Sequence, residues 1–482
     1  MAVLYLPDLL YRDGVFRPGE GLLAGDNGAI LAVGAPSEAS RVAVVRMRGK
    51  ALLPGLVNAH SHSFQRLIRG VSEHAGPNGD DFWAWRNTMY QAASALEADE
   101  VFDVARMAFL EMALSGIASV GEFHYIHRRR DGSAYDDPNL LAKKVIDAAM
   151  SVGIRICLLR VAYERAGHEL PPHPGQRRFY ETPGEYLGNA ELLAGYLRGL
   201  PATVSMGVAP HSIRAVTLDS LIEMTHWARE RDLPIHIHAA EQTAEIAACE
   251  REHGAPPIRL LARHGLLSRR TTLVHAIHTE PDEMEAMAAA AASICACPTT
   301  ERNLGDGIID AEQAIEQGIG FCFGSDSQAH IDLLEDAREL DYHLRLTRRR
   351  RVLLDGIGGV EMSQRLFRYA TEGGAVSLGL NVGRLEPGRR ADFFTVDLND
   401  VSIAGVPAEE LLPAVVFALN RTAIRDVVVD GRQVIGDGRH TDYDDIVSRY
   451  RRIAGKAFTR RPEDESEPRN YGSEAAKPFI RC

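Results

Sequence analysis

The chain lacks an excess of basic residues: 54 lysines and arginines stand against 66 aspartates and glutamates, so the 482 residues carry a net charge of −12. Without a global positive field, the binding of nucleic acid is excluded as the main function. A locally positive pocket for a small anion remains compatible with this balance. The rest of the composition is that of a globular protein, and the length predicts more than one domain.

Long apolar runs and regularly spaced cysteines are missing too. The first fourteen residues have no basic start and reach Asp8 before an apolar run forms, so we expect neither a signal peptide nor, elsewhere, a membrane span. Six cysteines are scattered, and only Cys295 and Cys297 are close together. A C-x-C spacing is not typical of a zinc pair. We interpret the cysteines as reduced thiols of a cytoplasmic protein.

Both ends of the chain carry short strand patterns that are broken by glycine and by an Asp-Asn-Gly turn. Two unrelated hairpins would each be marginally stable. We therefore predict one small composite β-sandwich domain built from residues 1–55 and 380–440. Residues 441–482 are expected to form a C-terminal helix and a polar tail, which is disordered or docks on a partner subunit in a homodimer.

The middle of the chain, residues 56–379, has a strand–helix rhythm. Short apolar runs alternate with segments of helical periodicity, and eight repeats predict an α/β fold, the closed parallel (β/α)8 barrel of TIM type. An open doubly wound sheet is the alternative, but it usually carries a glycine-rich phosphate loop after its first strand, and none is visible. The runs are residues 53–60, 118–124, 154–163, 204–211, 234–241, 271–278, 292–299 and 319–326.

Histidines recur where these runs end. In such a barrel the C-terminal ends of the strands meet at one face, which carries the active site. A single histidine there is readily explained as a hydrogen-bonded residue of the barrel mouth, but six occupied strand ends out of eight are not. The residues are His60 with His62, His124, His211, His238 with Glu241, His275, and Asp326.

Three histidines and the aspartate form a candidate metal site. His60 and His62 are two residues apart and point to the same side of an extended strand. With His238 and Asp326 they offer three imidazoles and one carboxylate, which suits one Zn²⁺ per chain, with Fe²⁺ or Mn²⁺ as substitutes. A catalytic zinc keeps one position open for water and lowers the pKa of that water to about 7. His236 shares a strand face with His238, and we predict that it packs deeper in the barrel.

Glu241 and His275 are candidates for proton transfer. Glu241 follows His238 by three residues and can stand beside the metal's water, carrying a proton to a leaving nitrogen. The alternative, a carboxylate that only stabilises a helix N-terminus, remains open. His275 ends the sixth strand and can hydrogen-bond the attacking oxygen, whereas His278 lies past the strand end. Asp326 can both bind the metal and accept a proton from the attacking water.

The combined motif resembles the amidohydrolase superfamily. It consists of H-x-H on the first strand, H-A-A-E on the fifth, H on the sixth and S-D on the eighth. The composite β-domain is similar to that superfamily as well. Members with two metals often bridge them through a lysine, and the fourth run, VSMGVAPHS, has none. The resemblance therefore implies the deaminase branch that uses one metal ion.

Within that branch, the chain resembles the formimidoylglutamate deiminases. The resemblance implies zinc-dependent hydrolysis of N-formimidoyl-L-glutamate to N-formyl-L-glutamate and ammonia in histidine degradation, with hydroxide attacking the amidine carbon and Glu241 shuttling the proton. Arginine forks match the carboxylates of such a substrate. The implied substrate anchors are Gln65, Arg86, Tyr125, His211 and Arg214. The matching stretches are NAHSHSFQRLIRG, DFWAWRNTMY, GEFHYIH, APHSIRAV, HIHAAEQTAEI, CPTTERNLGDG and GSDSQAHIDLLEDARELDYHLRL.

Two alternatives stay open at this point. Another one-zinc deaminase or dechlorinase, acting on a ring such as guanine, cytosine or a triazine, would share the chemistry and differ in its anchors. Two arginines favour an anionic substrate over a neutral aromatic one. A metal-binding barrel without activity, serving as a structural or regulatory subunit, would need neither Glu241 nor His275.

Overall fold

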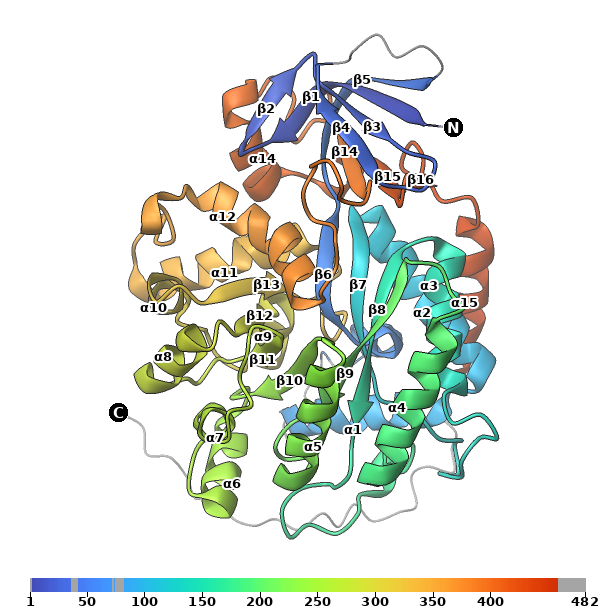
Figure 1. Cartoon of the computed structure of the whole chain (residues 1–482), viewed down its shortest axis with the longest axis vertical. Coiled ribbons are helices and arrows are strands. Elements are labelled where there is room, and N and C mark those ends of the chain that lie inside the picture. The colour runs from blue at the N-terminus through green and yellow to red at the C-terminus, as the bar shows by residue number, and fades with distance from the viewer. Residues whose placement is uncertain (1, 36–41, 72, 74–81, 458–482) are drawn as a thin grey trace.

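Two sheets organise the computed structural model, which describes residues 2–35, 42–71, 73 and 82–457. Figure 1 shows the N-terminal (blue) and C-terminal (orange) strands gathered in one layer at one end, with the second sheet and its surrounding helices below. The two chain ends thus share a sheet, while the middle of the chain forms the other.

The second sheet is a parallel barrel in the strand order β6 to β13. Its seam closes between the first and the last strand, where the amide of His62 donates to the carbonyl of Asp326 (3.0 Å) and the amide of Asp326 donates to that of His60 (3.1 Å). The barrel predicted from the sequence is therefore confirmed. The strands are β6 (Leu56–Ser61), β7 (Ile117–His124), β8 (Arg155–Ala162), β9 (Val204–Pro210), β10 (Ile235–Ala239), β11 (Thr271–His275), β12 (Ser293–Ala296) and β13 (Gly320–Phe323).

Every residue of β6, β7, β8, β10 and β11 is buried. Helices cover the outside of a parallel barrel, which is why its strands read as nearly continuous apolar runs. The helices bury one stripe each, as Leu141, Val145 and Val152 do on α3. The helices are α1 (Phe82–Ala95), α2 (Ala98–Leu114), α3 (Leu140–Val152), α4 (Pro183–Leu197), α5 (Leu218–Glu230), α6 (Thr243–His253), α7 (Pro257–Arg263), α8 (Pro281–Ala289), α9 (Pro298–Leu304), α10 (Ala311–Glu316), α11 (Leu333–Arg348), α12 (Met362–Arg368) and α13 (Gly374–Ser377).

The first sheet is mixed and takes strands from both chain ends in the order β16-β15-β14-β5-β1-β3-β4, with β2 paired to β1. The domain limits drawn from the sequence stay predictions. The strands are β1 (Val3–Arg12), β2 (Val15–Pro18), β3 (Gly21–Ala24), β4 (Ile30–Gly34), β5 (Ala43–Pro54), β14 (Phe393–Asp397), β15 (Ile424–Val429) and β16 (Arg432–Ile435), and the helix α14 (Leu411–Ala418) lies nearby in sequence.

The chain crosses from one sheet to the other at Gly55, between β5 and β6. The apolar run 53–60 was expected to be one strand, but Leu53 pairs with Phe394 in the first sheet and β6 begins only at Leu56. A Cβ at Gly55 would lie 2.6 Å from the Cβ of Ala118. Only a residue without a side chain fits at this crossing.

The final described helix, α15 (Tyr443–Ala457), returns to the barrel and packs on α2. Tyr450 Oη accepts from Arg66 Nη1 at 3.0 Å, and Arg106 pairs with Asp445 at 3.0 Å. The predicted polar tail lies outside the described residues. Within the described ranges, no helix combines the length and the apolarity that a membrane crossing requires.

Five cysteines of the described ranges are buried free thiols. Cys295, Cys297 and Cys322 pack with Ala59 and Val274 in one small cluster. The C-x-C pair therefore serves packing in the barrel, in agreement with the prediction of reduced thiols.

Candidate active site

The four predicted metal ligands converge at the barrel seam. The Nε2 atom of His60 lies 3.2 Å from that of His62 and 3.1 Å from that of His238. Asp326 Oδ1 lies 3.3 Å from His60 Nε2 and 3.1 Å from His62 Nε2. Zinc with ligands at about 2.0–2.1 Å in a tetrahedron separates neighbouring ligand atoms by about 3.3 Å. The spacing of these side chains therefore fits one such ion.

The tautomers of two histidines also fit a metal. Nδ1 of His62 lies 3.0 Å from the carbonyl of Phe123, and Nδ1 of His238 lies 3.0 Å from that of His211. Because a carbonyl only accepts, each Nδ1 carries the hydrogen and each Nε2 directs a lone pair at the same point. Burial lowers the pKa of His60 to about 3, which keeps that imidazole neutral as well. Such a group of converging donor atoms is suited to bind a metal cation.

His275 stands beside this cluster among three carboxylates. Its Nδ1 lies 3.2 Å from Glu301 Oε1, and its Nε2 lies 3.7 Å from Glu241 Oε1 and 3.8 Å from Asp326 Oδ2. Burial alone would lower the pKa of His275, but Glu241, Glu301 and Asp326 outweigh it and raise that pKa to about 10. The side chain is thus a protonated donor at neutral pH.

Glu241 is buried at the end of β10, and burial raises its pKa, with the negative charge of Asp326 adding to the effect and His275 opposing it. A carboxyl whose pKa moves toward neutrality can both take and give a proton. The backbone at Glu241 is held in place, because its amide donates a hydrogen bond to Glu245 Oε2 at 3.2 Å. The group is therefore held as a candidate proton carrier.

Two of the strand-end residues have left-handed backbones. His275 has φ 73° and Asp326 has φ 45°, and neither is a glycine. Such conformations cost about 1–3 kcal/mol and persist only where surrounding structure enforces them. At Asp326 the two seam hydrogen bonds to β6 supply that support.

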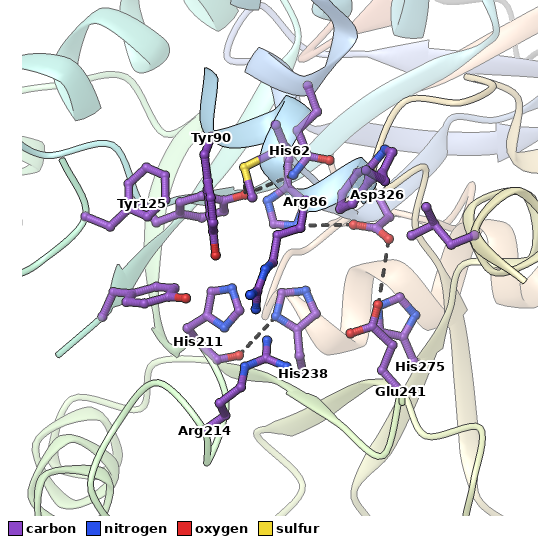
Figure 2. Close-up of a pocket in the computed structure, with 16 residues that line it drawn as sticks. His62, Arg86, Tyr90, Tyr125, His211, Arg214, His238, Glu241, His275 and Asp326 are labelled. Carbon is purple, nitrogen blue, oxygen red and sulfur yellow. Dashed lines mark hydrogen bonds and ion pairs between the residues drawn. The ribbon is translucent and has the colours of Figure 1, made fainter. Parts of the chain in front are cut away.

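A pocket opens onto these groups, and the predicted metal-binding, catalytic and anchoring residues line it apart from His60, which is fully buried. In Figure 2 the side chains of Arg86 and Arg214 reach toward each other beside His211 and His238, while Glu241, His275 and Asp326 lie on the other side. Gln65 Nε2 donates to Tyr125 Oη at 2.9 Å above His62. The lining residues are His62, Gln65, Trp85, Arg86, Met89, Tyr90, Tyr125, Tyr163, Phe179, His211, Arg214, His238, Glu241, His275, Leu304 and Asp326.

His211 and Arg214 follow β9 and share this wall. Burial, followed by the charge of Arg214, lowers the pKa of His211 well below its usual value, so its ring is neutral. Arg214 Nε is buried and has no hydrogen-bond partner among the described residues. A half-buried guanidinium whose buried Nε donor is unused by the described residues favours an anionic ligand.

His124 does not join the pocket, although it ends β7. Successive strand residues face opposite sides, so Phe123 and Tyr125 face the metal ligands, with Phe123 4.6 Å from the His238 ring, and His124 lies beside His127 instead. His236 hydrogen-bonds the carbonyl of Ser377 at 3.1 Å, deep in the barrel.

Sequence reasoning missed several residues of the site. Glu301 reads in the sequence as an acidic residue in the first turn of a helix, and only the fold brings it to His275. Tyr90 ends the matching stretch DFWAWRNTMY and Tyr163 ends the run 154–163, but neither was singled out as a site residue. The other missed lining residues are Trp85, Met89, Phe179 and Leu304.

The amidohydrolase family profile matches residues 51–434. Formimidoylglutamate deiminase from Pseudomonas aeruginosa is 38% identical over 409 residues, which cover 85% of this chain and 90% of that protein. A 5-methylthioadenosine/S-adenosylhomocysteine deaminase from Halobacterium salinarum is 26% identical over 445 residues, covering 92% and 94%.

Among solved structures, an amidohydrolase from Brucella melitensis superposes with a TM-score of 0.86 at 31% identity. The match covers 94% of this chain and 99% of that one. Both the barrel and the composite sheet therefore have counterparts in one known protein.

Proposed function

The chain belongs to the amidohydrolase family, and from that premise we propose that it is a zinc-dependent deiminase that converts N-formimidoyl-L-glutamate to N-formyl-L-glutamate and ammonia in histidine degradation. As a hydrolase acting on carbon–nitrogen bonds it is more than a metal-binding barrel. The observation that carries the choice of substrate is the pair Arg86 and Arg214, which face the proposed reacting groups across one pocket.

His60, His62, His238 and Asp326 would hold one Zn²⁺ ion, with Fe²⁺ or Mn²⁺ as substitutes. The support is the spacing of their four donor atoms and the lone pairs of His62 and His238. When bound, zinc supplies Lewis acidity, which makes water a nucleophile at neutral pH. Imidazole with carboxylate is a common zinc donor set, which favours this ion.

The residues around the metal site then divide the proton transfers. Glu241 takes one proton from the attacking water and delivers it to the terminal nitrogen of the formimidoyl group. It then carries the second proton of that water, now on the added hydroxyl, to the same nitrogen as the carbon–nitrogen bond breaks, so that the nitrogen leaves as ammonia. His275, held protonated by the surrounding carboxylates, donates from Nε2 to the oxygen that becomes the formyl carbonyl. The carbon–nitrogen bond to the glutamate portion is retained, so the products are N-formyl-L-glutamate and ammonia.

The proposed anchors orient the amidine. Arg86, Arg214, His211, Gln65 and Tyr125 would hold the two carboxylates, so that the terminal nitrogen faces Glu241. Water attacks the right carbon only when the substrate is held in this orientation, which gives the anchors a role in rate as well as affinity.

A ring deaminase is the alternative, and the relative from Halobacterium salinarum is named for such substrates. Two guanidinium groups in one half-buried wall match a dianion better than a neutral ring. The predicted cytoplasmic location and homodimeric state belong to the same proposal. Buried free thiols favour a reducing compartment.

The test is a substrate assay on zinc-loaded protein. We expect equimolar ammonia and N-formyl-L-glutamate from N-formimidoyl-L-glutamate, with the metal-free protein as control. 5-Methylthioadenosine and guanine should release no ammonia above background. Formamide as the product, or faster turnover of either ring, would refute the proposal.

A further inference from the structure

A hydrogen-bonded network outside the predicted site ends in the pocket wall. Gln176 lies in η2 (Pro174–Gln176), within the connection between β8 and α4, and is almost fully buried. Its Nε2 lies 2.6 Å from Tyr90 Oη and 2.7 Å from Tyr163 Oη. One amide group therefore holds two tyrosines that come from α1 and from the end of β8.

The neighbours of Gln176 determine which way its amide faces. The backbone amide of His173 donates to Tyr180 Oη at 3.1 Å, so that oxygen is an acceptor. Tyr180 then has its own proton to donate, and it lies 2.5 Å from Gln176 Oε1. The carbonyl side of Gln176 thus faces Tyr180, and its NH₂ group donates one hydrogen to each of Tyr90 and Tyr163.

Because both tyrosine oxygens accept from Gln176, their own protons must be donated elsewhere. The two hydroxyls are also close to each other, so that one of the two protons can be shared between them. Within the described part of the chain, no hydrogen bond uses the other proton, which leaves it for a ligand. Burial raises the pKa of Tyr163 well above its usual value, so that hydroxyl stays neutral and keeps its hydrogen.

The surroundings of these hydroxyls are cationic. Both tyrosines line the pocket with Arg86 and Arg214, and the guanidinium carbon of Arg86 lies 5.5 Å from the centre of the Tyr90 ring. In Figure 2 the Tyr90 hydroxyl points to the same side as the two guanidinium groups. Guanidinium groups only donate, so this end of the pocket offers positive charge and donors together. A carboxylate, with about four lone-pair sites, is the matching ligand.

We propose that Tyr90 and Tyr163 bind the side-chain carboxylate of the substrate as neutral donors beside the two arginines, and that Gln176 is the positioning residue that aims both hydroxyls. The identity of the substrate rests on the proposed function, whereas the carboxylate site itself does not. Tyr163 is separated from the metal ligand His238 by the ring of His211, with ring centres 4.7 and 4.8 Å apart. The carboxylate farther from the amidine is the one that reaches across this gap.

The same arrangement makes the site selective against a side-chain amide. An amide has only one accepting oxygen, and its NH₂ group would face the hydroxyl and guanidinium donors. A buried polar group left without a partner costs far more than a missing apolar contact, so hydrogen-bonding sites discriminate strongly. Glutamate is therefore preferred to glutamine in this pocket.

The experiment compares N-formimidoyl-L-glutamate with N-formimidoyl-L-glutamine on zinc-loaded protein. Tyr163→Phe removes one hydroxyl donor. The isosteric Gln176→Glu replaces the NH₂ group by a carboxylate oxygen, which accepts the hydroxyl protons of the tyrosines and so diverts them from the ligand. We expect each variant to raise KM for the glutamate substrate by about 10- to 100-fold, with a smaller change in kcat. The preference for glutamate over glutamine should fall by a similar factor.

Tyr186→Phe is the matched control, because Tyr186 is also fully buried and donates one hydrogen bond, to the carbonyl of Arg160 at 2.8 Å, away from the pocket. Its KM values should stay within twofold of the wild type. Equal losses on both substrates in Tyr163→Phe would indicate a purely structural role and overturn the inference, as would an unchanged KM.

A binding measurement separates this inference from the proposed function. If the wild type releases no ammonia from N-formimidoyl-L-glutamate, the proposed function fails, and calorimetry with glutarate decides the inference. A Kd raised at least tenfold in Tyr163→Phe, but not in Tyr186→Phe, supports the carboxylate site. Equal Kd values, or no binding to the wild type, overturn it.

Discussion

Single residues set the charge of the site. One protonated imidazole, His275, lies among Glu241, Glu301 and Asp326, so it is a donor held in place by carboxylates on several sides. Of these three carboxylates, only Glu241 both lines the pocket and lies outside the candidate group of His60, His62, His238 and Asp326 that would bind the metal. Its contribution to turnover can therefore be separated from metal binding.

Replacing Glu241 by Gln should leave the zinc content near one per chain while kcat falls at least about 100-fold, since an amide cannot carry the proton. Metal analysis and the ammonia assay on the same preparation measure the two effects. Glu285→Gln, an exposed change on α8, is the control. Near-normal kcat in Glu241→Gln would remove the residue from the proton-carrying role.

At the scale of elements, the packing of β6 against β7 supports the metal ligands. Gly121 of β7 faces the carbonyl of Ala59, the residue before His60, and an added Cβ would lie 2.5 Å from that oxygen and 2.6 Å from Leu378 Cδ2. A backbone oxygen cannot rotate away as a side chain can. The strand carrying His60 must therefore move if this position gains a methyl group.

We expect Gly121→Ala to lower the free energy of unfolding by about 1–3 kcal/mol, as overpacking in cores does, and to weaken zinc retention during dialysis. Gly188→Ala on α4 is the control, because nothing lies within 4 Å of its added Cβ and alanine favours a helix. Thermal melting and metal analysis measure both proteins. A Gly121→Ala protein with wild-type Tm and zinc content would contradict this account of the strand pair.

At the scale of the whole molecule, a buried ion pair joins the two sheets. Arg155 at the start of β8 donates from Nε and Nη2 to the two carboxylate oxygens of Asp392, just before β14, at 2.9 and 3.0 Å. Both side chains are nearly inaccessible, at 3% and 1% of their surface. The backbone carbonyl of Asp392 also accepts from Gly55, the residue at which the chain crosses between the sheets.

Asp392→Asn removes the two-bond partner of the buried Arg155 and leaves only Asp430, whose Oδ1 lies 3.3 Å from Arg155 Nη2, so we expect the protein to lose about 1–3 kcal/mol of stability. Chemical denaturation compares it with Asp282→Asn, which breaks a similar two-bond pair with Arg259 on the exposed surface and should change little. Because the pair lies far from the pocket lining, kcat of the folded Asp392→Asn protein should stay normal. Equal stability of the two variants would show that the sheets are held by other contacts.

The sequence by itself determined the barrel and the level at which its polar residues gather. Apolar runs of strand length and the i, i+2 spacing of His60 and His62 are local periodicities, which need no tertiary information. The sequence did not determine whether the His124 side chain points into the barrel or out of it. That orientation depends on the register of the strand, and the composition of the strand does not reveal the register.

Only the tertiary structure decided which residues complete the pocket wall. Contacts between distant segments bring Tyr90 and Tyr163 into the pocket wall, and they place Gln176 and Glu301 behind it. The need for a glycine at position 55 likewise follows from the close approach of Ala118, a contact between residues that are sixty-three positions apart. Packing between distant segments, and not local preference, sets these positions.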